Sequence, residues 1–140
     1  MTARPLDITD GLPLFDYEPH LDDDPDPGEV VWAWLPFEDD PTRGKDRPAL
    51  VLARAGDDVV VAQLTSQDHD RDAADEARWG RYWFDIGSGP WDRRGRPSEV
   101  RLDRLLLLAP AAVRREGAVL DRDVFVAVVR AMVDLHTPRL

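Results

Sequence analysis

Apolar segments of strand length recur along residues 28–108 and predict a domain built mainly of β-strands. Residues 29–35, EVVWAWL, are apolar at both alternating sets of positions, which predicts a strand that is covered on both faces. The other segments whose length and composition predict strands are 47–54, 59–65, 80–86, 98–102 and 104–108. Residues 70–78 are predicted as a short helix or a loop, and residues 110–117 as a helical turn.

The clearest helix is predicted over residues 121–136, with Asp121 as its N-cap. Its apolar residues recur at spacings of three and four and form one face: Val124, Phe125, Val128, Val129, Met132 and Leu135. Five or six short strands followed by one helix predict a strongly bent antiparallel sheet, or partial barrel, packed on that helix.

The length of 140 residues is that of one domain. Residues 28–140 are predicted to form it. Residues 1–27 are rich in proline and aspartate and are expected to be a poorly ordered extension. The cluster Leu12, Leu14, Phe15 and Tyr17 leaves open the alternative that part of this extension docks on the domain.

The composition narrows the compartment and the chemistry. The chain has no cysteine, which excludes disulfides, thiolate catalysis and cysteine-based metal sites. No window approaches the roughly 18 apolar residues of a membrane span, and the N-terminus lacks the apolar core of a signal peptide. We therefore expect a cytoplasmic protein with no membrane association.

A net charge of −10 by itself argues against a nucleic-acid partner. The distribution of the charges along the chain removes this objection. Residues 1–40 carry 12 acidic side chains and one basic side chain, a net of −11. Residues 41–140 carry 16 acidic and 17 basic side chains, a net of +1. The acidity thus belongs to the N-terminal part, and residues 16–26 could lie across a cationic groove of the same or of a partner subunit.

The segment 43–67 holds the main candidate site. If its two apolar segments pair as a hairpin, the start of one lies beside the end of the other, so that Arg47 is next to Thr65 and Ser66. A guanidinium beside hydroxyls can bind a phosphate or another anion. An ion pair of Arg47 with Asp46 or with another acid is the structural alternative.

Three further sets of residues are candidates for substrate binding. Lys45 and Arg43 precede Arg47 in a cationic loop. A second loop carries arginines beside a tryptophan, which fits either a single-stranded nucleic-acid surface or a solvated turn with the indole in the core: Trp91, Arg93, Arg94 and Arg96. His69 lies between two aspartates that favour its charged form, which suits either proton transfer or an exposed loop. No spacing matches a standard metal motif, so no metal site is predicted.

The order of GEVVWAWLP, GKDRPALVL, VVVAQLTS and SEVRLDRL before a C-terminal helix resembles the PemK/MazF family of toxins from type II toxin–antitoxin systems. The resemblance covers residues 28 to about 135. Each motif is short, and their order and spacing are more specific than any one of them. The resemblance implies an SH3-like small barrel of about five to seven strands with a C-terminal helix.

The resemblance also implies a function. Members are homodimers that cleave single-stranded RNA, mainly mRNA, without a metal or cofactor, through a 2′,3′-cyclic phosphate. A cognate antitoxin protein inhibits them, and the complex binds DNA. The family's catalytic Arg corresponds to Arg47, before Pro48, and its catalytic Thr or Ser to Thr65, with Ser66 adjacent. Thr42 stands where many members carry an acid, which leaves the general base unassigned. A non-catalytic binding module on the same barrel and a topoisomerase-inhibiting toxin are the alternative functions.

Overall fold

A computed structural model describes residues 3–8, 11–20, 24–66 and 81–137. Its strands are β1 (Arg4–Pro5), β2 (Glu29–Pro36), β3 (Gly44–Ala55), β4 (Asp58–Thr65), β5 (Trp83–Gly87), β6 (Ser98–Leu108) and β7 (Val113–Val119). A 3-10 turn, η1 (Pro110–Ala112), precedes β7, and the chain continues into α2 (Arg122–His136).

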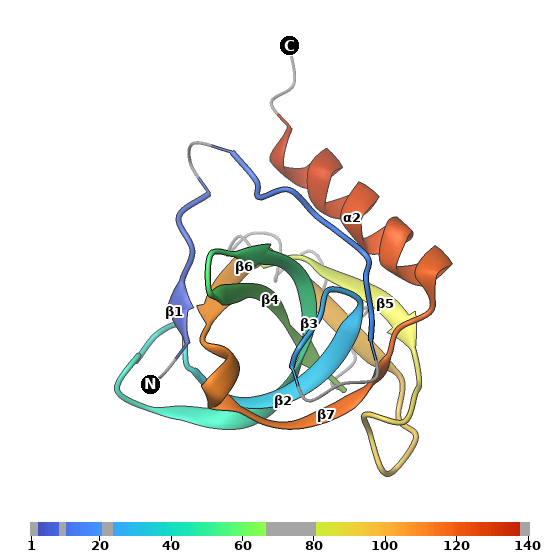
Figure 1. The fold of residues 1–140 in the computed structure, drawn as a ribbon, viewed down its shortest axis with the longest axis horizontal. Coiled ribbons are helices and arrows are strands. Elements are labelled where there is room, and N and C mark those ends of the chain that lie inside the picture. Colours follow the sequence, from blue (N-terminus) through green and yellow to red (C-terminus); the bar gives the residue numbers. More distant parts are fainter. Residues whose placement is uncertain (1–2, 9–10, 21–23, 67–80, 138–140) are drawn as a thin grey trace.

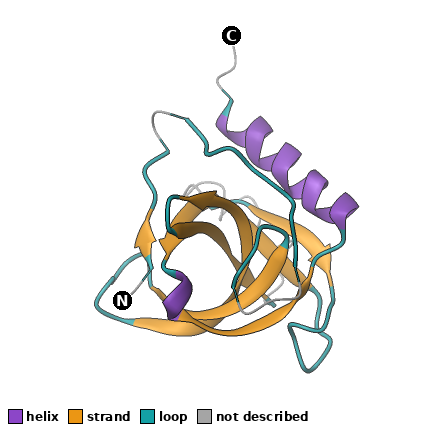
Figure 2. Cartoon of the chain, viewed as in Figure 1, coloured by secondary structure: helices purple, strands orange, loops and turns teal. Residues whose placement is uncertain are grey.

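The strands form one antiparallel sheet in the order β1-β6-β4-β3-β2-β7, with β5 paired to β6. The sheet curves round on itself, and α2 lies outside the curve beside β5 and β6 (Figure 1). Strand dominates the described chain, with η1 and α2 the helical elements (Figure 2). Among the described strands no ladder joins β1 to β7, so the barrel is open. This architecture confirms the mainly β prediction with one C-terminal helix.

Two apolar clusters cover the two faces of the sheet. The outer cluster joins the sheet to the buried side chains Phe125, Val128 and Met132 of α2. The inner cluster is formed by side chains on the opposite face of the strands. Val30 belongs to the outer cluster and Val31 to the inner one, and both are fully buried. The prediction that β2 is covered on both faces is therefore confirmed.

Two sequence-based boundaries were wrong. Residues 98–102 and 104–108 form a single strand, β6, which passes through an irregularity in its pairing with β4 between Ala62 and Leu64. The helical turn predicted over 110–117 is restricted to η1. The remaining residues pair as β7 with β2, because the second edge of β2 would otherwise leave its backbone groups without partners.

The C-terminal helix is confirmed, and its buried residues come from the predicted apolar face. Asp121 occupies the N-cap position, but its side chain makes no capping hydrogen bond, and its carbonyl accepts from the amide of Phe125. The short helix considered for 70–78 lies outside the described residues. Among the helices of the described chain, none has both the length and the apolar composition to cross a bilayer.

The N-terminal segment was expected to be a solvated extension, but its described residues lie against the domain. β1 pairs with β6, and Leu6 donates its amide to the carbonyl of Leu105. The side chains that pack on the outer cluster are Leu6, Ile8, Leu12, Phe15 and Tyr17. Leu14, which was grouped with them, is 93% exposed.

Tyr17 joins this segment to the start of α2. Its hydroxyl donates to the carbonyl of Leu120 at 2.7 Å, and its ring lies 5.2 Å from that of Phe125 between centroids. Burial, and secondarily the charge of Asp121, raise the pKa of Tyr17, so the hydroxyl remains a donor. The segment thereby connects the barrel and the helix.

The described acidic residues Glu18 and Asp26 lie away from the positive charges around Arg47. Glu18 and Asp26 both pair with Arg54, near the far end of β3. Arg47 is seven residues away on that strand, roughly 20 Å along an extended chain. Glu18 and Asp26 therefore neutralise a different part of the molecule.

Candidate functional site

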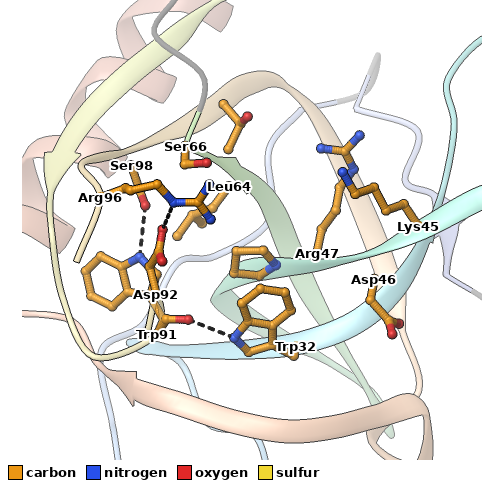
Figure 3. A pocket seen from close by; sticks show the side chains of 12 residues that line it. Trp32, Lys45, Asp46, Arg47, Leu64, Ser66, Trp91, Asp92, Arg96 and Ser98 are labelled. Atoms are coloured by element: carbon orange, nitrogen blue, oxygen red, sulfur yellow. Dashed lines mark hydrogen bonds and ion pairs between the residues drawn. The ribbon is translucent and has the colours of Figure 1, made fainter. Parts of the chain in front are cut away.

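The pocket that contains the predicted site opens where β3 and β4 separate, and its volume is about 190 Å³ (Figure 3). The last paired residues of the two strands are Ala49 and Gln63. The residues that line the pocket are Trp32, Lys45, Asp46, Arg47, Pro48, Leu64, Thr65, Ser66, Trp91, Asp92, Arg96 and Ser98. Of the residues predicted from the sequence, the structure thus brings together Arg47, Thr65, Ser66, Lys45, Trp91 and Arg96.

The strand register places Arg47 opposite Thr65. Ala49 pairs with Gln63, so two residues further along this antiparallel register Arg47 comes level with Thr65. Both side chains then lie on the same face of the sheet. Ser66 follows at the exposed end of β4. A guanidinium and two hydroxyls therefore border one opening.

Arg47 is a half-buried cation, and burial lowers its pKa from the ordinary value. The alternative ion pair with Asp46 is not formed. Asp46 points to the other side of β3 and pairs with Arg114, with 3.3 Å between Arg114 Nε and Asp46 Oδ1 (Figure 3). Within the described parts of the chain Arg47 has no carboxylate partner, so the pocket has an uncompensated positive charge that favours an anion.

The prediction of a cationic loop was wrong for Lys45 and Arg47, which belong to β3 because that strand already pairs with β2 from Gly44, and Arg43 precedes the strand. Lys45 lies two residues before Arg47, points the same way and lines the pocket (Figure 3). Arg43 is exposed outside the pocket, and its backbone carbonyl accepts from the amide of Phe37. Thr42 donates its hydroxyl to Asp40 Oδ1 at 2.6 Å, so a carboxylate lies next to this position.

Trp91 is a core residue that forms one wall of the pocket rather than an exposed stacking surface. It is 4% exposed and belongs to the outer cluster. Its indole N–H donates to Ser98 Oγ at 3.0 Å, and its carbonyl accepts the indole N–H of Trp32 at 3.1 Å. These bonds attach the 88–97 loop to β2 and β6.

Of the three arginines of this loop, Arg96 is the one that lines the pocket. Its Nε donates to Asp92 Oδ2 at 2.8 Å, while the amide of Arg94 donates to Asp92 Oδ1 at 2.9 Å. Burial alone would raise the pKa of Asp92, but these two bonds outweigh it and hold the pKa below its ordinary value. Arg93 and Arg94 are exposed outside the pocket. His69 lies outside the described residues.

The packing of the loop gives a first prediction. A Cβ at Gly89 would overlap the ring of Trp91, so Gly89→Ala is expected to lower the free energy of unfolding by about 1–3 kcal/mol. Thermal or urea unfolding measures this change. Ser88→Ala, at an exposed position of the same loop, should stay within about 0.5 kcal/mol of the wild type. Equal stability of the two variants would mean that Trp91 is not fixed as described.

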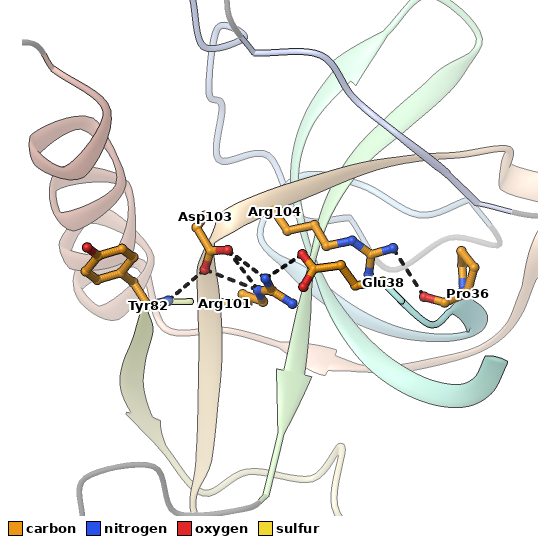
Figure 4. A network of polar contacts seen from close by, with 6 residues as sticks. All are labelled: Pro36, Glu38, Tyr82, Arg101, Asp103 and Arg104. Atoms are coloured by element: carbon orange, nitrogen blue, oxygen red, sulfur yellow. Dashed lines mark hydrogen bonds and ion pairs between the residues drawn. The ribbon is translucent and has the colours of Figure 1, made fainter. Parts of the chain in front are cut away.

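Sequence reasoning missed a charged network beside the pocket. Arg101 is 5% exposed, donates to both oxygens of Asp103 and reaches Glu38 Oε2 at 2.7 Å (Figure 4). The amide of Tyr82 donates to Asp103 Oδ1 at 2.7 Å, and Arg104 donates to the carbonyl of Pro36. Burial alone would lower the pKa of Arg101, but the two carboxylates outweigh it and raise the pKa.

This network extends to Arg47 through Arg104. Burial lowers the pKa of Arg104, the charges of Arg101 and Arg47 lower it further, and Glu38 and Asp103 oppose the change. The five charged groups are therefore electrostatic neighbours. The signal in the sequence was the interruption of an apolar strand by Arg101, Asp103 and Arg104, since charges on a covered strand need partners.

The described residues contain no group of three or more histidine, aspartate or glutamate side chains arranged to hold a metal ion. What they offer instead is a set of cations and hydroxyls around a pocket with an apolar wall. Such a site can bind a phosphate and stabilise negative charge that develops on it.

The comparison with protein families agrees with this chemistry. A family model described as PemK-like, MazF-like toxin of type II toxin–antitoxin system matches residues 26–135, and the chain therefore belongs to this family of toxins. Members are typically endoribonucleases, with an RNA substrate and an antitoxin partner. No curated protein matches the chain at a significant level.

Proposed function

We propose that this protein is an endoribonuclease that cuts single-stranded RNA by internal attack and needs no metal. The observation that carries the proposal is Arg47, a half-buried cation without a carboxylate partner in the described chain, held opposite Thr65 in the pocket. An anionic substrate would compensate this charge. Family membership makes RNA the expected substrate.

In the proposed reaction the ribose 2′-oxygen attacks the adjacent phosphorus, and the bond from phosphorus to the 5′-oxygen breaks. The products are a 2′,3′-cyclic phosphate and a 5′-hydroxyl. Arg47 donates two hydrogen bonds to the phosphate oxygens and stabilises the charge of the pentavalent state. Thr65 and Ser66 donate from the opposite side, and Lys45 adds a further positive charge.

Two proton transfers complete the reaction. The 2′-hydroxyl loses a proton to a base, and the leaving 5′-oxygen gains one. Glu38 and Asp103 are the candidates for the base, because they belong to the charged network that reaches Arg47 through Arg104. Neither carboxylate lines the pocket itself, so either can act as the base only where the bound RNA brings its 2′-hydroxyl to the pocket margin.

The family also supports the proposed partners. We propose that the protein works as a cytoplasmic homodimer whose activity a cognate antitoxin blocks, and that the complex binds DNA. A cationic pocket is a suitable target for an acidic segment of an antitoxin, since such a segment would compete with RNA for the same charges.

The test is incubation of the purified protein with a long single-stranded RNA in excess chelator. Discrete cuts whose fragments carry 2′,3′-cyclic phosphate and 5′-hydroxyl ends are expected, and a 2′-deoxy substitution at a cut site should abolish that cut. Intact RNA, with circular dichroism showing a folded protein, would contradict the proposal. Binding without cleavage would favour the non-catalytic module, and inhibition of a purified topoisomerase would favour the third function.

A further inference from the structure

The pocket has an apolar floor beside its phosphate-binding end. Trp32 and Pro48 are cross-strand partners of β2 and β3, and both line the pocket. The hydrogen bond from the Trp32 indole to the Trp91 carbonyl fixes the plane of the ring. A fixed aromatic surface next to a phosphate site is where a nucleotide base can stack.

Arg96 reaches the same space from the opposite side. Its guanidinium is directed into the pocket in Figure 3, and Asp92 holds it through Nε. The two terminal nitrogens have no hydrogen-bond partner among the described residues. Arg96 therefore presents two parallel N–H donors in a fixed orientation.

The charges of the two ends of the pocket differ. Asp92 neutralises Arg96, and its lowered pKa keeps it ionised at neutral pH. Arg47 and Lys45 have no such carboxylate in the described chain. A net cation is suited to a phosphate, whereas a neutralised arginine contributes direction and hydrogen bonds but little net charge. The Arg96 end thus suits a neutral group with acceptors.

We propose that this end of the pocket is a guanine subsite, in which the base stacks on Trp32 and Pro48 while Arg96 donates to its O6 and N7. Guanine carries these two acceptors side by side, which matches the spacing of the terminal nitrogens of Arg96. Adenine presents a donor amino group beside N7 and loses one bond. The proposal rests on the proposed function, because it assumes that RNA occupies the pocket.

The loop is built to hold Arg96 in this position. Gly95 adopts a φ of 64°, a conformation that side chains rarely take, and its amide donates to the carbonyl of Asp92. The amide of Asp92 donates to the carbonyl of Gly89, and the buried Trp91 anchors the turn. A donor pair that is fixed before binding pays little entropy on binding, and so discriminates between bases more strongly.

Binding to a library of all single-stranded RNA heptamers tests the proposal, with 2′-O-methyl groups to prevent cleavage. The wild type should enrich guanine at one position by roughly 10-fold or more over each other base. Arg96→Ala should lose this preference. Arg130→Ala, which removes an exposed charge of α2 outside this pocket, should retain it. Replacing the selected guanine by 7-deazaguanine should weaken binding to the wild type but not to Arg96→Ala.

The variant Asp92→Asn tests whether Asp92 positions and neutralises Arg96. The salt dependence of RNA binding is the readout, because a purely structural role of Asp92 would not change it. The side chain keeps its shape but no longer neutralises Arg96. The guanine preference should fall, while the slope of the logarithm of affinity against the logarithm of salt concentration should steepen by about 0.7, as for one additional phosphate contact. An unchanged slope together with an unchanged preference would overturn the proposal.

The remaining outcomes separate this proposal from the proposed nuclease. Cleavage of unmodified RNA by a protein that shows no guanine preference, or the same preference in Arg96→Ala, overturns the subsite and leaves the nuclease intact. A guanine preference that Arg96→Ala removes, in a protein that leaves unmodified RNA intact, supports the subsite and counts against the nuclease. No binding to any library member overturns the subsite.

Discussion

Arg47→Ala is expected to reduce the rate of RNA cleavage by about 10²–10³-fold, the effect of removing one principal donor to a developing negative charge. Arg47 is the pocket cation that is both half-buried and opposite Thr65, so the loss removes charge stabilisation in a partly desolvated position. The fold should be unaffected, because the guanidinium makes no ion pair within the described chain that its removal would break. Single-turnover cleavage of a short RNA, with circular dichroism and thermal unfolding in parallel, measures both quantities.

Two further variants sharpen this prediction. Arg47→Lys keeps the charge but loses the fork that matches two phosphate oxygens, so its rate should lie between those of the wild type and Arg47→Ala. Arg114→Ala removes an equally charged side chain that pairs with Asp46 on the other side of β3, and should cleave at the wild-type rate. Cleavage by Arg47→Ala within a few-fold of the wild type would remove Arg47 from the mechanism.

The hairpin arrangement could be predicted from the sequence because local rules determine it. Two apolar segments joined by a short polar turn pair with each other, and the pairing brings Arg47 to the end of β4 at Thr65 and Ser66; the irregularity between Val51 and Ala53 sets the register that makes Arg47 level with Thr65. The same holds for α2, where the spacing of apolar residues is enough to identify the buried face. These features depend on neighbours within a few tens of residues.

The features that were missed depend on distant contacts. Asp103 and Glu38 meet at Arg101 although 65 residues separate them in sequence, and no local pattern indicates that meeting. Trp91 was left between the core and the surface, because its exposure is decided by Ser98 and by the absence of a side chain at Gly89. Composition indicates which residues can do chemistry, but burial and partners decide which of them face the pocket.

Composition misled most at the N-terminus. Aspartate and proline are typical of disordered chain, yet every second residue between Phe15 and Pro19 is partly buried, as in an extended strand with one covered face. Asp16, which lies between two such residues, donates its amide to the carbonyl of Leu52. Asp16 and Glu18 occupy the solvent side of this stretch, so their charge does not oppose its packing.

Removal of residues 1–20 is accordingly expected to destabilise the protein by several kcal/mol. Five apolar side chains of this segment pack on the outer cluster, and burial contributes on the order of 1 kcal/mol for each when it is partial. The loss is comparable to the whole stability of many small domains, so the truncated chain should unfold at a markedly lower temperature and denaturant concentration. Urea unfolding followed by tryptophan fluorescence measures the change.

A matched pair of point variants shows whether the stability comes from the packing of individual side chains or from the presence of the segment as such. Phe15→Ala should lower the free energy of unfolding by about 1–3 kcal/mol, because Phe15 packs on the outer cluster, whereas Leu14→Ala should change it by less than about 0.5 kcal/mol. If the segment instead covered the RNA site through its acidity, truncation would strengthen RNA binding and leave stability unchanged. The pairing of Glu18 and Asp26 with Arg54, far along β3 from Arg47, predicts the opposite result on both measurements.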